Sequence, residues 1–232
     1  MQFFPRAHAL IFLTTLTITA CWAQNAAPPA DSAPTEDKRI AGILPNYRTT
    51  DGTVPYEPIT AKQKLGIAAK DSFDWPAYVL SASFAGFYQL ENSNPSFGQG
   101  AAGYARRFGT AFGDQCIGNM MAEGFVPAAF HQDPRYFRKI NGTVKERLFY
   151  SLAQLFVARS DHGGRMFNFG EVLGNGIGAS VANAYYPDNR GFGDTISRMG
   201  IAIGTDGASN ILKEFWPDIK KHFRQPANGT KN

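Results

Sequence analysis

Two polar segments of the chain carry residue types that could hold a metal ion. The segment HQDPRYFR contains His131 and Asp133, and the segment SDHGGR contains Asp161 and His162. Imidazole nitrogens and carboxylate oxygens are ordinary ligands of zinc and similar divalent metals. Both segments are expected to follow helices, so they could meet at one end of a helical domain. Their spacing matches no recognised metal motif, and the competing interpretation is a pair of exposed loops with turn hydrogen bonds.

A second candidate is the pair Glu171 and Asn175, which lie four residues apart on one face of an expected helix. A glutamate that packing removes from water has a raised pKa and can serve as a general acid or base. In the simpler interpretation, which we favour, Asn168 begins the helix and Glu171 caps it from the third position. The pair is nevertheless the one catalytic candidate that the sequence offers.

A similar polar ladder occurs near the C-terminus, formed by Asp206, Asn210 and Glu214. It lies opposite Gly204 and Ala208 on the expected helix, so we predict that the ladder faces solvent. No serine-nucleophile motif is present, and the glycine-rich segment GQGAAG follows no strand, which excludes a dinucleotide-binding loop. We therefore predict no cofactor, with a divalent metal as the alternative.

The elements that would position these residues contain small side chains at every fourth position. On a helix, such residues form a bare ridge that another backbone can approach closely. We predict three ridges of this kind, in helices that pack closely. They consist of Ala101, Ala105, Gly109 and Gly113; of Gly170, Gly174, Gly178 and Ala182; and of Gly200, Gly204 and Ala208.

The helices themselves are predicted from apolar periodicity and from capping signals. Thr60 with Gln63, and Thr143 with Glu146, have capping-box spacing. No segment alternates polar and apolar residues as a half-buried strand would. The prediction is an all-α bundle of about six or seven helices over residues 60–224. Its fifth helix would extend from Thr143 to about Arg159, and Pro217 would separate the last long helix from a short terminal one.

Residues 1–23 have the pattern of a signal peptide, with one arginine before a short apolar run and small residues at the end. Cleavage after Ala23 is favoured over lipidation of Cys21, which lies in a lipobox-like sequence. Residues 24–39 are rich in alanine and proline and predict a disordered linker. Residues 40–59 are expected to form an extended arm, and residues 225–232 a polar tail.

Charge and cysteine content narrow the choice of partners. The formal net charge of +4 is spread along the chain without a basic cluster, which argues against nucleic acid. After cleavage one cysteine, Cys116, would remain, so the exported domain must be held by packing or by association, including a homo-oligomer. No segment is a clean membrane span, and we expect a bundle that is soluble or lies beside a membrane.

Several segments together resemble a family of exported helical proteins from acidobacteria. They are ILPNYRT, PITAKQKLGIAAKDSFD, FGQGAAGYARRFG, HQDPRYFR, YYPDNR and ILKEFWPD, and they extend over nearly the whole mature domain. The resemblance implies export. It carries over no activity and no catalytic residues, since the family has no assigned activity.

We therefore expect a non-enzymatic protein of the cell envelope, in the periplasm or associated with the outer membrane. It would bind a membrane surface or an envelope protein. The alternative is an envelope hydrolase with a divalent metal held by the loops that carry His131 and His162.

Overall fold

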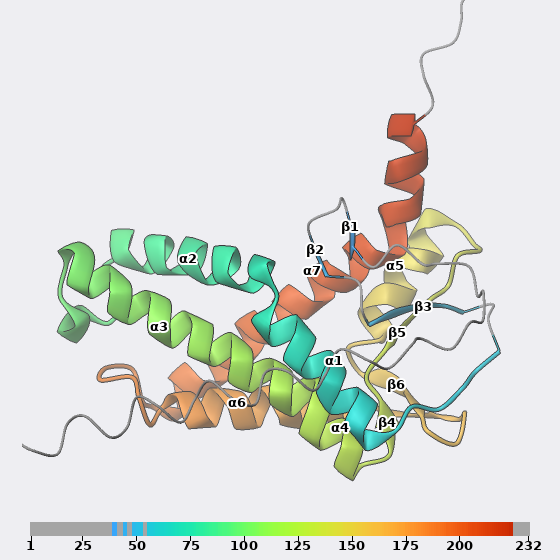
Figure 1. Ribbon diagram of the computed structural model, residues 1–232, viewed down its shortest axis with the longest axis horizontal. Helices are drawn as coiled ribbons and strands as arrows, with labels where there is room; N and C mark the ends of the chain where they lie inside the picture. Colours follow the sequence, from blue (N-terminus) through green and yellow to red (C-terminus); the bar gives the residue numbers. More distant parts are fainter. Residues whose placement is uncertain (1–38, 41–43, 46–47, 53–54, 225–232) are drawn as a thin grey trace, which may run out of the picture. The chain divides into compact units, whose positions relative to one another are not determined.

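The computed structural model describes residues 39–40, 44–45, 48–52 and 55–224. The predicted signal peptide, Cys21, the polar tail and all of the predicted linker except its last residue lie outside this part of the chain. The described part is all-α, as predicted, with several short strands beside the helices (Figure 1). None of its helices is both long enough and apolar enough to cross a membrane.

The helices follow one another along the chain in this order. They are α1 (Ala61–Phe73), α2 (Trp75–Leu90), the 3₁₀ turn η1 (Pro95–Phe97), α3 (Gly100–Asn119), the π-helical segment η2 (Met120–Phe125), α4 (Val126–Ala129), α5 (Val144–Ala153), the π-helical segment η3 (Gly170–Gly174), α6 (Asn175–Ala182) and α7 (Phe192–Arg224).

Capping boxes explain where helices α1 and α5 begin. The Thr60 hydroxyl accepts a hydrogen bond from the Gln63 backbone at 3.3 Å, and the Gln63 side chain accepts one from the Thr60 backbone at 2.8 Å. Thr143 and Glu146 make the same reciprocal pair at the start of α5. These bonds satisfy N–H groups that have no partner within the first turn of a helix, so the predicted capping boxes are confirmed.

The short strands were not predicted from the sequence. They are β1 (Arg39–Ile40), β2 (Leu44–Pro45), β3 (Thr49–Asp51), β4 (Gln132–Asp133), β5 (Tyr136–Arg138), β6 (Val157–Ser160) and β7 (Arg165–Phe167).

Strand β3 pairs in parallel with β5, and β4, β6 and β7 form an antiparallel sheet. Because β6 takes its backbone partners from both neighbours, α5 ends at Ala153 and the expected helix to Arg159 is wrong. Strands of two to four residues are too short to show an alternating pattern.

The ridge of Gly170, Gly174 and Gly178 lies against the backbone of η2 and α3. A Cβ added to Gly174 would lie 2.4 Å from Cα of Ala122, and one added to Gly178 would lie 3.2 Å from Cα of Gly118. Ala182, at the end of this ridge, is buried against Phe97 and Tyr186. Only residues without a larger side chain allow the two backbones to approach so closely.

The other two predicted ridges do not make such contacts. Nothing lies within 4 Å of a Cβ added to Gly109, Gly200 or Gly204, and Gly113 meets only the end of the Tyr185 side chain. Ala101, Ala105 and Ala208 are exposed. The fourfold spacing creates a surface that a backbone can approach, but the positions of the neighbouring helices decide whether one does.

The packing order of the helices places α2 and α7 on opposite sides of a gap. Helix α2 packs along α3, α3 packs on α6, and α6 packs on α7, while α5 packs on the other half of α7 (Figure 1). Helix α7 continues through Pro217 to Arg224, so the predicted break at this proline is wrong. A cavity lies between α2 and α7.

Candidate functional site

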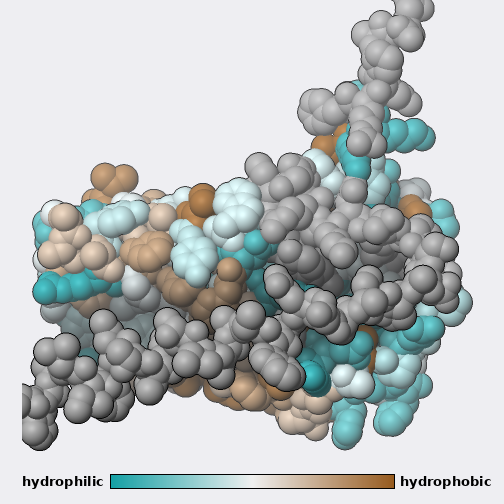
Figure 2. Space-filling view, in the orientation of Figure 1, coloured by the Kyte–Doolittle hydropathy of each residue, from teal (hydrophilic) through white to brown (hydrophobic). Residues whose placement is uncertain are grey.

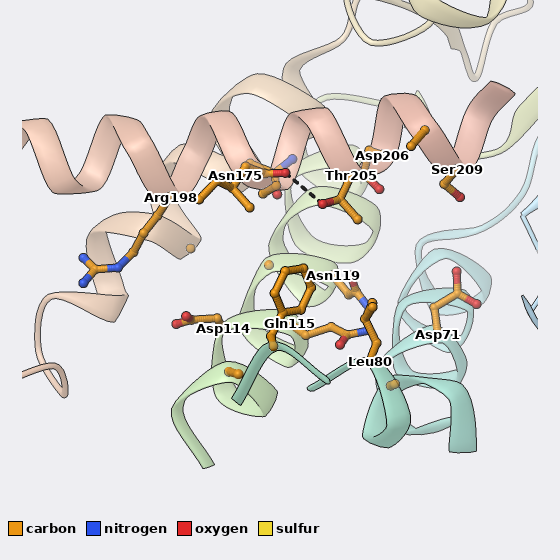
Figure 3. A pocket seen from close by; sticks show the side chains of 18 of the residues that line it. Asp71, Leu80, Asp114, Gln115, Asn119, Asn175, Arg198, Thr205, Asp206 and Ser209 are labelled. Atoms are coloured by element: carbon orange, nitrogen blue, oxygen red, sulfur yellow. Dashed lines mark hydrogen bonds between the residues drawn. The ribbon is translucent and has the colours of Figure 1, made fainter. Parts of the chain in front are cut away.

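A cavity of about 470 Å³ opens between α2, α3, α6 and α7. Its wall is mainly apolar and combines small residues, which leave the space open, with a few larger side chains. In Figure 3, Arg198 and Asp114 lie toward one side of this cavity and Asp71 toward the other. The apolar lining includes Ala77, Leu80, Phe84, Ala111, Ala179, Ala202 and Leu212.

One end of the cavity is closed by a cluster of charged residues centred on Arg48. Its guanidinium lies 2.8 Å from Glu123 Oε1, 3.4 Å from Asp71 Oδ2 and 3.6 Å from Asp206 Oδ1. Burial lowers the pKa of Arg48, but the charges of Glu123, Asp206 and Asp71 outweigh burial and raise it. The guanidinium is therefore permanently charged and holds three elements together, since its carboxylate partners lie on α1, η2 and α7.

Two glutamate carboxyl groups of this cluster have raised pKa values. Burial raises the pKa of Glu123 well above its usual value, and the nearby charges of Asp71 and Asp206 act in the same direction. Burial also raises the pKa of Glu171 to about 9, helped by the charge of Asp206. Near neutral pH, Glu171 therefore keeps its proton.

The sixth member of the cluster is Lys213, which is only 5% exposed and lines the cavity. Burial and the nearby Arg48 lower the pKa of Lys213 to about 8, although the carboxylates oppose this shift. The carboxyl groups thus surround the two basic side chains, Arg48 and Lys213. Groups of opposite sign lie close together, which offsets part of the cost of burying them.

The opposite end of the cavity holds a smaller polar group. The Asp114 carboxylate accepts hydrogen bonds from the hydroxyls of Tyr185 and Tyr186, the latter at 2.7 Å. Burial raises the pKa of Asp114, while the two tyrosine hydroxyls act to lower it. Arg198 lies 4.2 Å from the centre of the Tyr186 ring and donates to Asn183. The cavity thus has polar groups at both ends and an apolar middle.

The two loops proposed as a metal site do meet. The backbone N–H of Asp161 donates to the carbonyl of His131 at 2.8 Å, and the rings of His131 and His162 lie 6.2 Å apart. Asp161 Oδ2 lies 4.0 Å from His131 Nδ1. The sequence therefore predicted the proximity of these three residues.

The carboxylates of these loops have other partners. Lys64 Nζ lies 2.6 Å from Asp161 Oδ2, and Arg135 donates to both oxygens of Asp133. Over the described residues, no group of three or more histidine, cysteine, aspartate or glutamate side chains is arranged to hold a metal ion. The two imidazoles alone are fewer than the three protein ligands of an ordinary catalytic zinc site.

The pair Glu171 and Asn175 has a different role from the one we favoured. Asn168 does accept a hydrogen bond from the Glu171 backbone at 3.0 Å, as a cap should. The Glu171 carboxyl, however, is 8% exposed and lies in the charged cluster, where it accepts a hydrogen bond from Asn175 at 3.2 Å. The capping interpretation was wrong for the side chain of Glu171, because Asp206 and Arg48 approach it from distant parts of the chain.

The ladder of Asp206, Asn210 and Glu214 is not the solvated face of α7. Asn210 is 8% exposed and Glu214 is fully buried. Glu214 accepts hydrogen bonds from Tyr136, from Arg147 and from the backbone N–H groups of Lys139 and Ile140. The polar face of α7 is therefore buried because α5 and the segment after β5 supply its partners.

Arg48 and Lys213 were missed as site residues. In the sequence, Arg48 is a single arginine in an extended arm and Lys213 is one of several charged residues on the last helix. One local signal was present: Lys213 lies on the same face as Asn210 and between Asp206 and Glu214, so burial of this face would have buried the lysine too.

Comparison of this chain with protein-family models, with curated proteins and with solved structures finds no match.

Proposed function

We propose that this protein is a non-enzymatic binding protein of the cell envelope that holds an apolar or amphipathic small molecule in the cavity between α2 and α7. The cavity is the observation that carries this proposal. Its volume of about 470 Å³ falls in the range of small-molecule sites, which combine a mainly apolar wall with a few placed polar groups. Export to the envelope rests on the signal-like sequence of residues 1–23 and on the resemblance to exported helical proteins.

A membrane surface is the partner that the outer face of α2 suits best. Figure 2 shows hydrophobic side chains gathered over this part of the molecule. Val79, Phe87 and Leu90 of α2, with Phe73 at the end of α1, are each more than half exposed. Such a concentration of exposed apolar side chains indicates contact with a membrane or another protein.

Leu80 of α2 is 40% exposed and lines the cavity, and it follows Val79 of the exposed face directly in the chain. Apolar side chains of α2 therefore continue from the exposed face to the cavity wall. This continuity favours a lipid-like ligand over a polar one.

The proposal is tested with an apolar fluorescent probe, N-phenyl-1-naphthylamine, titrated into the purified protein. We expect saturable binding by the unmodified protein. Ala202→Phe adds a ring to the cavity wall and should weaken binding at least about tenfold, since the space for the probe is filled. Ala102→Phe, on the exposed face of α3, is the matched control and should bind normally. Absence of saturable binding, or equal binding by the two variants, would refute the proposal.

A further inference from the structure

Lys213 differs from the other fully buried lysine of the domain. Lys64 is 1% exposed, and its ammonium lies 2.6 Å from Asp161 Oδ2 and 3.3 Å from the Pro127 carbonyl. Lys213 is 5% exposed, and no hydrogen bond or ion pair joins its Nζ to another residue of the described chain. Lys213 lines the cavity. Among the described residues, it is therefore the buried lysine that a ligand in this cavity can meet.

The charged groups that face Lys213 come from every element packed around it. They are Arg48 from the arm, Asp71 from α1, Glu123 from η2 and Asp206 from α7, with Glu171 from η3 behind Asp206. These groups act on Lys213 through their charge rather than through direct contact. Burial and Arg48 lower the pKa of Lys213 to about 8. The neutral amine is therefore well populated at a pH only slightly above neutral.

The cluster holds charges of both signs, and this limits which polar head can enter it. An anionic head would meet Asp71 and Asp206, and a cationic head would meet Arg48 and Lys213. A neutral head adds no further charge to the site. A carbonyl group is such a head, and it is also the group that a neutral lysine amine attacks.

We propose that Lys213 forms a reversible imine with an apolar aldehyde whose hydrocarbon body occupies the cavity. This inference rests on the proposed function, because the same cavity must accept the body of the ligand. Lys213 supplies the nucleophile, the apolar wall excludes bulk water, and the carboxylates of Asp71 and Asp206 compensate the positive charge of the protonated imine.

The reaction balances without an oxidant or reductant. The lone pair of Lys213 Nζ forms a bond to the carbonyl carbon, the electron pair of the carbonyl double bond moves to its oxygen, and a proton moves from nitrogen to that oxygen. The resulting hydroxyl accepts a proton and leaves as water. The proton donor is Glu123, which lines the cavity and whose pKa burial raises well above its usual value. The products are the protonated imine and one water molecule.

The test is reductive trapping. The purified protein is incubated with decanal and sodium cyanoborohydride, and the product is analysed by intact mass and by peptide mapping. We expect one decyl group per chain, on Lys213, formed at least about tenfold faster than on the exposed Lys62. The rate should rise with pH and level off above about pH 8, as the amine loses its proton. Labelling spread over exposed lysines with no preference for Lys213 would overturn the proposal.

Variants separate the chemistry from the cavity. Lys213→Met keeps the length of the side chain but removes the amine, and should abolish the fast labelling, whereas Lys62→Met should leave it unchanged. Ala202→Phe keeps Lys213 but fills the cavity, so it should also abolish the fast labelling. This variant tests the proposal even if Lys213→Met does not fold. Persistence of fast labelling in Ala202→Phe would count against the site.

Decanol distinguishes the two proposals. If decanol displaces N-phenyl-1-naphthylamine while decanal leaves Lys213 unlabelled, the cavity binds apolar chains and the imine proposal is wrong. If neither decanol nor the probe binds, the proposed function fails, and the imine proposal fails with it.

Discussion

Replacement of Glu214 by alanine tests the finding that Glu214, on the polar face of α7, is buried. Glu214 is fully buried, and its carboxylate accepts hydrogen bonds from Arg147 Nε at 2.8 Å and from the Tyr136 hydroxyl at 2.8 Å. It also accepts the backbone N–H groups of Lys139 and Ile140, at 3.0 and 3.2 Å. One carboxylate thus joins α7 to α5 and to the end of β5.

The expected loss of stability follows from what remains after the carboxylate is removed. Arg147 would keep its exposed partner Asp218 but lose its buried one, and breaking a buried pair costs about 3–5 kcal/mol. The two backbone N–H groups would lose their acceptor. Ile140 has a φ of +62°, a conformation that a β-branched residue adopts only when its surroundings impose it, so this turn would also be released. We expect Glu214→Ala to lower the free energy of unfolding by about 4 kcal/mol.

The assay is urea unfolding followed by circular dichroism at 222 nm, with Asp218→Ala as the matched control. Asp218 pairs with the same arginine, 2.5 Å from Arg147 Nη1, but its side chain is 57% exposed. An exposed pair contributes at most about 1 kcal/mol, so this control should remain close to the unmodified protein. Glu214→Gln, expected to lose about 2 kcal/mol, covers the case in which the alanine variant does not fold. A loss below about 1 kcal/mol for both Glu214 variants would refute the buried position of this face.

Two further experiments examine packing and protonation by the same unfolding assay. Gly174→Ala would place a Cβ 2.4 Å from Cα of Ala122 and should cost about 1–3 kcal/mol, whereas Gly204→Ala meets nothing within 4 Å and should gain up to about 1 kcal/mol. Equal effects would show that η3 does not approach η2 so closely. The folded protein holds a proton on Glu171 up to about pH 9 that the unfolded chain loses near 4.5, so stability should fall as pH rises through this window, by up to about 1.4 kcal/mol per pH unit. Glu171→Gln should reduce this slope, and an unchanged slope would contradict the raised pKa of Glu171.

The sequence predicted those features that depend on neighbouring residues. Thr60 and Thr143 mark the beginnings of two helices because a hydroxyl and a side chain three residues later satisfy each other's backbone N–H groups. The all-α class followed from apolar periodicity along single helices. The proximity of His131 and His162 also followed, since both loops were expected at one end of the domain.

The sequence did not show which polar residues are buried. Glu171, Asp206 and Lys213 have the spacing of ordinary helix-surface residues. This spacing is the same whether the helix face is exposed to solvent or buried. Arg48, which lies in a separate arm, meets three carboxylates from α1, η2 and α7 in this cluster. No periodicity within one helix reports a partner that arrives from another segment.

The features of the candidate site therefore fall into two groups with different physical causes. The types of residue, the helix starts and the small residues that line the cavity are properties of the chain and can be read from it. The cavity, the raised pKa of Glu171 and the lowered pKa of Lys213 exist only once α2, α7 and the arm are packed together. They depend on burial and on charges brought close in space, and only the tertiary structure determines both.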